Sequence, residues 1–156
     1  MDGSLIGIIG IVASFGLSAI GAGIGMAANR PAVIGAWKKC HVQKKPAPFI
    51  LIVFASTCLT NVIYGFITMM SLTPEIAAGS DLAASLVALG PEELYRRGVM
   101  GIVAGICIGI VAITQAMCSA AAADAYAETG QGFGNHLMVV GVAETISLFA
   151  MVFAIM

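Results

Sequence analysis

The stretch GVMGIVAGICIGIVAITQAMCSAAAA, residues 98–123, carries no charged residue and decides the fold. A helix rises ~1.5 Å per residue, so about 20 apolar residues cross the ~30 Å hydrocarbon core of a bilayer. Three more apolar runs reach this length, at residues 3–29, 49–72 and 137–156. We therefore predict an all-α membrane protein with four transmembrane helices.

The composition agrees with a membrane protein. Hydrophobic residues make up 60% of the chain and charged residues 10%, with a mean hydropathy of +1.02. Soluble domains have about a quarter charged residues. The net charge of −1 gives no reason to expect nucleic-acid binding, and the four cysteines form no CxxC pair that would suggest a metal site. The first run has no basic segment before it, so we expect it to be retained rather than cleaved as a signal peptide.

Basic residues are unevenly divided between the connections, and this predicts the topology. The first connection has five and the second has two, which places the first in the cytoplasm by the positive-inside rule. Both hairpin bends are then cytoplasmic and both termini external. We divide the chain into a first hairpin (residues 1–72), an external connector (73–97) and a second hairpin (98–156). The basic residues are Arg30, Lys38, Lys39, Lys44 and Lys45, against Arg96 and Arg97.

Turn-forming residues predict where the chain bends. Asn29, Arg30 and Pro31 predict the start of the first bend, and Pro46 and Pro48 precede the second helix. The glycine-rich residues 130–134 predict the second bend, within a loop over residues 124–136. In the connector, Ser80 and Asp81 predict the start of a short interfacial helix that ends at Gly90, and Pro91 suits the first turn of the next helix.

The two hairpins resemble each other. An offset of 83 residues aligns the fourth helix with the second and places Glu144 opposite Asn61, and an offset of 94 aligns the third with the first. The first and third helices are also rich in glycines four residues apart, such as Gly21 and Gly25. Glycines at this spacing let another backbone approach closely, either within one bundle or around an axis shared by several subunits.

Glu144 is the one charged residue of the last apolar run. It lies seven residues past Leu137, or ~10 Å into the membrane. A lone carboxylate at this depth costs several kcal/mol, so a proton or a cation should neutralise it, and ionisable groups in the membrane are functional hypotheses by default.

Polar side chains on two other helices could share the level of Glu144. Thr57, Asn61, Tyr64 and Thr68 are four, three and four residues apart on one helical face, with Thr60 beside them, and Gln115 lies in the third helix. Carboxylate, amide and hydroxyl oxygens are the ligands of hard cations. Two alternatives remain: the threonines bond their own backbone, and Asn61 and Gln115 bond each other.

At these residues the chain resembles a known family, the proteolipid or c-ring subunit of V-type and A-type rotary ATPases, in its duplicated four-helix form. The resemblance covers nearly the whole chain and rests on TNVIYGF at residues 60–66, on Gln115 and on AET at residues 143–145. The spacing of 29 residues between Gln115 and Glu144 is similar to that of sodium-binding members. GSD at residues 79–81 is a weaker match, and Asn29 to Pro31 is similar to the loop that faces the central stalk.

The resemblance implies a role for each site residue. Glu144 is the ion-carrying carboxylate, and Tyr64 donates a hydrogen bond that closes the site around it. The implied Na⁺ ligands include Gln115, Thr60 and Asn61, with Asn61 one methylene shorter than the Gln of sodium-binding relatives. A backbone carbonyl at Thr57 completes the set.

The resemblance also implies a non-catalytic function. Identical subunits form a ring in the lipid bilayer, a stator subunit with a basic residue displaces the ion, and stalk subunits bind the cytoplasmic loops. Ion flow couples to ATP hydrolysis or synthesis elsewhere in the complex, because this chain has no GxxxxGK[ST] motif. No covalent cofactor is expected. The oxygen donors favour Na⁺ over H⁺ as the transported ion, and the shortened Asn61 is the argument against it.

Two other functions compete with this interpretation. A small proton-coupled four-helix exporter would also use one membrane carboxylate, but it needs an aromatic-lined cavity, and aromatics make up only 7% of the chain. A scaffold that merely oligomerises through its glycines leaves Glu144 unexplained.

Overall fold

The computed structural model describes residues 3–74 and 82–156, and it confirms the all-α class. No strand occurs in these residues. Four helical segments are long and apolar enough to cross a membrane, as predicted. The elements in chain order are α1 (Gly3–Val42), the 3₁₀ turn η1 (Phe49–Leu51), α2 (Ile52–Ser56), α3 (Leu59–Leu72), α4 (Leu82–Ala88), α5 (Pro91–Thr129) and α6 (Phe133–Ile155).

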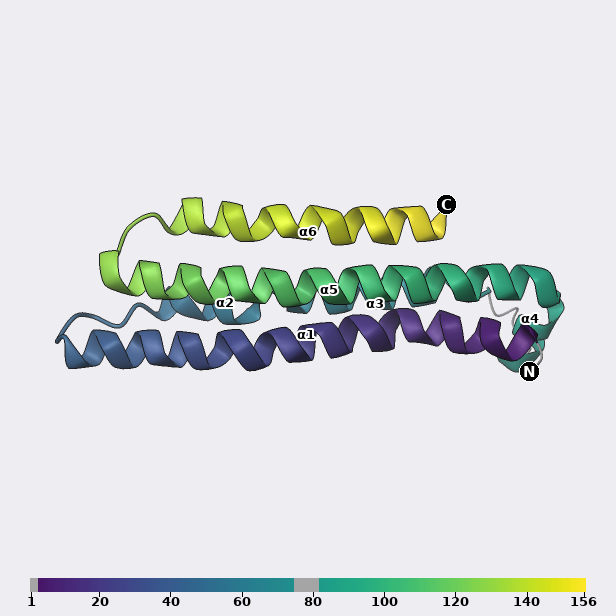
Figure 1. Ribbon diagram of the computed structural model, residues 1–156, viewed down its shortest axis with the longest axis horizontal. Coiled ribbons are helices and arrows are strands. Elements are labelled where there is room, and N and C mark those ends of the chain that lie inside the picture. Colours follow the sequence, from purple (N-terminus) through teal and green to yellow (C-terminus); the bar gives the residue numbers. More distant parts are fainter. Residues whose placement is uncertain (1–2, 75–81) are drawn as a thin grey trace.

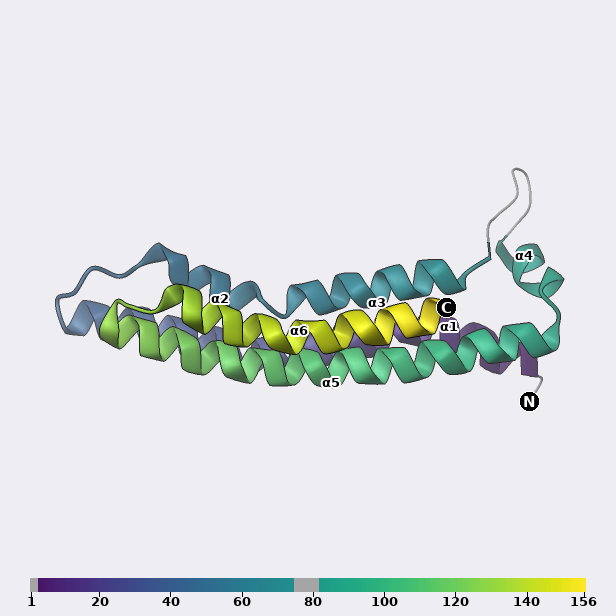
Figure 2. The same cartoon turned by 90° about the horizontal axis from the view of Figure 1, so that it is seen from above.

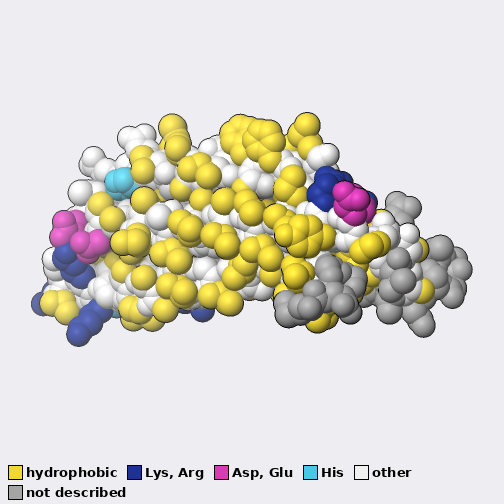
Figure 3. Space-filling view, turned by 45° about the vertical axis from the view of Figure 1, so that its right-hand side comes forward, with side chains coloured by type: hydrophobic (Ala, Val, Ile, Leu, Met, Phe, Trp, Pro, Cys, Tyr) yellow, Lys and Arg dark blue, Asp and Glu magenta, His cyan; other side chains and the backbone are white. Residues whose placement is uncertain are grey.

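The two longest helices, α1 and α5, lie side by side and run in the same direction (Figures 1 and 2). The α2–α3 segment and α6 run back in the opposite direction, so the two short bends share one end of the molecule. Both chain ends point toward the other end, where α4 also lies. In the space-filling view, hydrophobic side chains cover the middle of the visible face and charged side chains gather near its two ends (Figure 3). This distribution suits a protein surrounded by lipid.

Glycines bring the backbones of α1 and α5 into direct contact, as their spacing predicted. A Cβ atom added at Gly21 would lie 2.2 Å from the carbonyl oxygen of Gly109, and one added at Gly10 would lie 2.2 Å from that of Gly98. Real Cβ atoms do not approach this closely, so the close approach requires glycine. The contact forms within one chain, and it holds α1 and α5 together as the central pair.

The prediction of a bend at Asn29, Arg30 and Pro31 is wrong. Helix α1 continues through Pro31 to Val42, and the first bend follows it. Proline removes one backbone hydrogen bond, but Pro31 is exposed, so its ring faces away from the packed side. On the buried side, residues of α1 pack against α2 and α5 and outweigh that loss. This cluster contains Val33, Ala36, Cys40, Leu51, Phe54, Ala122, Ala123, Ala127 and Val140.

The second bend is shorter than predicted. Helix α5 extends past Ala123 to Thr129, and the loop consists of residues 130–132. Gly130 and Gly132 have φ angles of 65° and 76°, the left-handed conformation that glycine adopts most readily. Lys39 of α1 forms ion pairs with Asp124, at 3.4 Å, and with Glu128, so the extended ends of α1 and α5 are linked by charge.

The connector contains the predicted short helix, α4, which begins at Leu82. Ser80 and Asp81, the predicted start, lie outside the described residues, as does Gly79. The predicted start of the next helix is confirmed, because Pro91 occupies the first turn of α5, with Glu92 and Glu93 beside it. Gly90 precedes it with a φ of 78°.

The second transmembrane segment is not one continuous helix. Helix α2 ends at Ser56 and α3 begins at Leu59, so Thr57 and Cys58 belong to neither. The interruption is visible between the labels α2 and α3 in Figure 2. Neither residue is a proline or a glycine, the usual causes of a break, so other contacts must hold this one open.

Candidate functional site

Glu144 lies midway along α6, whose buried residues follow one line along the helix. The buried residues of α6 are Val140, Ser147 and Ala154, each seven residues from the next. Glu144 is four residues after Val140 and three before Ser147, so it lies on the same face. The carboxylate is half-buried, and its Oε1 accepts a hydrogen bond of 3.0 Å from the Tyr64 hydroxyl of α3.

Beside this pair, three buried side chains from three helices form a polar cluster. Asn61 Nδ2 of α3 donates to Gln115 Oε1 of α5, and Ser147 Oγ of α6 donates to Asn61 Oδ1. Gln115 Nε2 lies 3.5 Å from the carbonyl oxygen of Val140. All three members of the cluster are at most 1% exposed. We call Asn61, Gln115 and Ser147 the amide cluster.

The threonines bond mainly to nearby backbone. Thr60 Oγ1 donates to the carbonyl of Thr57 at 2.9 Å, and Thr68 Oγ1 donates to that of Tyr64 at 2.8 Å. Thr57 Oγ1 makes a cross-helix contact of 2.6 Å with Ser119 Oγ of α5. A hydroxyl that donates to a carbonyl keeps its own lone pairs, so Thr60 retains the ability to bind a cation.

The structure therefore brings the sequence-predicted residues to one region, but in two hydrogen-bonded groups. Glu144 is joined to Tyr64, whereas Asn61 and Gln115 are joined to each other, which is one of the alternatives left open by the sequence. Ser147, one turn along α6 from Glu144, connects the helix of the carboxylate to the amide cluster. Sequence reasoning missed Ser147 and Ser119, although the spacing of three residues between Glu144 and Ser147 indicated a shared face.

The charged partners found in the structure lie away from Glu144. The ion pairs recorded in the described residues join Lys39 to Asp124 and Glu128, and join Glu93 to Arg96 and Arg97, near the two ends of α5. Within the same described ranges, no cluster of three His, Cys, Asp or Glu side chains could hold a metal ion. A cation at Glu144 would thus be bound by one carboxylate together with neutral oxygens.

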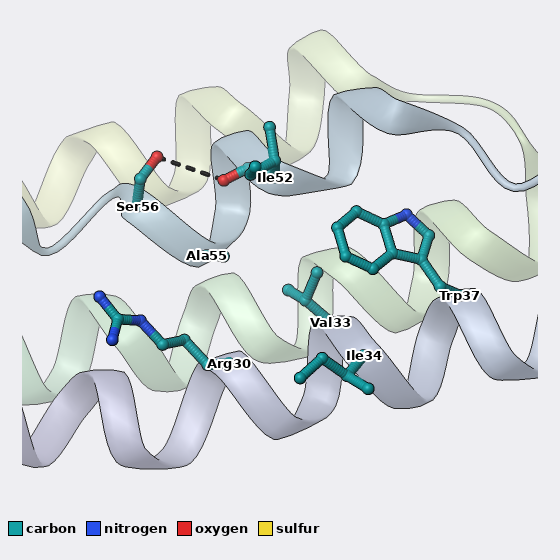
Figure 4. Close-up of a pocket in the computed structure, with 7 residues that line it drawn as sticks. All are labelled: Arg30, Val33, Ile34, Trp37, Ile52, Ala55 and Ser56. Carbon is teal, nitrogen blue, oxygen red and sulfur yellow. Dashed lines mark hydrogen bonds between the residues drawn. The ribbon is translucent and has the colours of Figure 1, made fainter.

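A separate groove lies between α1 and α2, with a volume of about 340 Å³. Arg30 and Trp37 of α1 line one side and Ile52 and Ser56 of α2 the other (Figure 4). Its lining is almost wholly apolar, and Ser56 Oγ bonds within its own helix, 3.2 Å from the carbonyl of Ile52. This groove lacks the oxygen donors of an ion site.

A comparison with known protein families finds a match in the second hairpin. Residues 99–156, which include Gln115 and Glu144, match the family model that describes the C subunit of ATP synthase. A search of the curated proteins finds no match.

Proposed function

We propose that the chain is a rotor-ring subunit of a rotary ATPase of the V or A type, which carries Na⁺ across the membrane on Glu144. The observation that carries this proposal is the position of Glu144, midway along a membrane-length helix that matches the C subunit of ATP synthase. Within this proposal the chain itself catalyses no reaction. It couples ion flow to rotation, and ATP is hydrolysed or formed in other subunits.

In this mechanism, the site is neutral when it is loaded. Na⁺ or H⁺ compensates the Glu144 carboxylate, so that the site can turn through lipid without net charge. Tyr64 holds the carboxylate toward α3 and closes the site. A basic residue of the stator then stabilises the bare carboxylate and releases the ion, as opposite charges within a few ångströms favour the ionised form.

We propose Na⁺ as the ion because neutral side-chain oxygens lie in the same region of the bundle as the carboxylate. Glu144 would contribute the charge, and Gln115, Thr60 and Asn61 would contribute side-chain oxygens, with a backbone carbonyl at Thr57. Each amide oxygen has two lone pairs and accepts one hydrogen bond within the amide cluster, so one pair remains for a cation. Binding requires Glu144 to move toward this cluster, along the face that it shares with Ser147.

The proposed partners follow from the ring. Identical copies of the chain surround a common axis, a stator subunit faces α6, and stalk subunits bind the cytoplasmic end. We place the two bends at this end and both termini outside, because the first connection is the more basic one.

Carbodiimide labelling of Glu144 tests the proposed ion. The reagent reacts with the protonated carboxyl, and mass spectrometry of the assembled particle follows the modification. At constant pH, added Na⁺ should protect Glu144 strongly. Glu144→Gln should abolish labelling and ion transport while the ring still assembles, whereas Glu92→Gln, which removes an exposed carboxylate at the start of α5, should change neither.

Labelling that responds to pH but not to Na⁺ would make the ring a proton carrier. The mass of the particle in detergent tests the rotor itself: a large closed ring supports it, and a dimer would support the exporter instead.

A further inference from the structure

The break between α2 and α3 leaves backbone carbonyls that a continuous helix would pair. In an unbroken helix, the carbonyl of Phe54 would accept the N–H of Cys58. Helix α2 ends before Cys58, so this carbonyl needs another donor. An unsatisfied backbone group at membrane depth costs several kcal/mol, which makes the identity of that donor important.

The donor comes from α1. Asn29 is fully buried, and its Nδ2 donates to the Phe54 carbonyl at 2.9 Å. Thr57 Oγ1 lies 3.3 Å from the same oxygen. Two side chains thus converge on one carbonyl at the edge of the break. Arg30, the next residue, lines the groove of Figure 4 and takes no part in this contact.

The second polar atom of the Asn29 side chain is the amide oxygen, Oδ1. Asn29 Oδ1 is buried and has no hydrogen-bond partner among the described residues. A buried acceptor without a partner costs about 1–3 kcal/mol, so a side chain selected only for packing would be apolar here. The hydrogen bond that Nδ2 donates to the Phe54 carbonyl is the contribution that an apolar side chain could not make.

The break adjoins the proposed ion ligands. Thr57 lies in it, and Thr60 and Asn61 follow in the first turn of α3. The carbonyl of Thr57 already accepts a hydrogen bond from Thr60. If the chain became one continuous helix, these three residues would rotate and shift together relative to α5 and α6.

We propose that Asn29 is a positioning residue for ion binding: by occupying the Phe54 carbonyl it holds the helix break open and keeps Thr57, Thr60 and Asn61 in the positions from which they would bind the ion. This inference rests on the proposed function, because it assigns a distant residue to the same site. Without the Asn29 donor, the Cys58 N–H can bond the Phe54 carbonyl and close the break. The ligands of α3 then turn away from their binding positions.

Two variants separate this role from a purely structural one. Asn29→Leu removes the donor and also the unsatisfied acceptor, so the protein should remain as stable as before while its Na⁺ affinity falls about tenfold, the effect of one buried hydrogen bond. Cys58→Pro removes the competing N–H, and the φ of −75° at Cys58 is one that proline adopts. The double variant Asn29→Leu/Cys58→Pro should therefore recover most of the lost affinity.

The experiment measures Na⁺ protection of Glu144 against carbodiimide in assembled rings, together with the midpoint of thermal unfolding. Ser14→Ala is the matched control, because Ser14 is an equally buried polar residue of α1 that bonds only its own helix. It should leave protection unchanged. Unchanged Na⁺ protection of Glu144 in Asn29→Leu would overturn the proposal. A double variant whose Na⁺ affinity remains as low as that of Asn29→Leu would also overturn it.

A second readout keeps this test independent of the proposed ion. If Na⁺ does not protect Glu144 in the unsubstituted ring, the proposed ion is wrong. The positioning role of Asn29 is then tested by the pH midpoint of Glu144 labelling. A midpoint displaced by about one pH unit in Asn29→Leu, the equivalent of a tenfold change, and restored in the double variant supports the positioning role. An unchanged midpoint overturns it.

Discussion

At the scale of single residues, the contact that matters most is the one between Tyr64 and Glu144. The hydroxyl of α3 lies 3.0 Å from the carboxylate of α6, and no other side chain is recorded as its donor in the described residues. This one bond therefore limits how freely the Glu144 side chain turns, and in the proposed ring it would restrain turning toward lipid or toward a stator.

Tyr64→Phe should loosen the site without changing its shape. Losing a hydrogen bond of this kind costs about 0.5–1.5 kcal/mol, so Glu144 should react with carbodiimide roughly two to ten times faster. Labelling rates at constant pH check this. Tyr126→Phe is the control, since Tyr126 packs edge-on against Phe133 near the bends and should leave the rate unchanged. Equal rates in all three proteins would show that the hydroxyl does not close the site.

Sequence reasoning identified the most polar residues of the site but not all of their contacts. Glu144, Asn61 and Gln115 stand out because each interrupts an apolar run. Ser147 does not stand out, since serine is common in membrane helices and usually bonds its own backbone. Asn29 was assigned to a bend, because a following proline normally favours one. Its side chain instead bonds a carbonyl twenty-five residues away, a contact that no local pattern reveals.

At the scale of helices, the main packing feature is the glycine contact between α1 and α5. The glycine spacing predicted close backbone approach, because such approach needs small residues on one face, but it left open whether the contact forms within one chain or between subunits. Helix ends were predicted less well. α1 and α5 continue past their apolar runs because each extended end packs against the other, and a local pattern does not contain that contact.

Gly21→Ala should destabilise the protein. Its Cβ would lie 2.2 Å from the Gly109 oxygen, and forcing α1 away from α5 costs about 1–3 kcal/mol. At Gly35 of the same helix there is nothing within 4 Å, so Gly35→Ala should instead gain up to ~1 kcal/mol of helix propensity. Thermal unfolding in detergent checks both. A stable Gly21→Ala variant would mean that the two helices can separate easily.

At the scale of the whole molecule, much apolar surface remains uncovered. Exposed side chains on α1 include Ile20 and Ile24, and Gly16 and Gly23, two turns apart, have no neighbour within 4 Å. In the proposed ring, this face of α1 packs against the next copy. The sequence does not specify which small residues serve contacts within the chain and which serve contacts between copies.

Gly23→Leu should prevent assembly without unfolding the chain. The added side chain enters open space in one protomer but would occupy the face offered to the next. We expect an unchanged helical circular dichroism spectrum and a loss of the large particle in detergent. Gly35→Leu, twelve residues further and a third of a turn around α1, should assemble normally. A full-sized Gly23→Leu ring would exclude this face as a contact between copies.

The small number of buried residues in α6 has a mechanical consequence. α1 and α5 approach each other closely along their backbones, so neither helix can shift without the other. α6 fully buries only Val140, Ser147 and Ala154, and its other packed residues, such as Phe133 and Met151, are half-buried. It is therefore the most loosely held of the membrane-length helices. In the proposed rotor, strain at the stator would then fall mainly on α6, the helix that carries Glu144. Ion exchange would proceed there without separating α1 from α5.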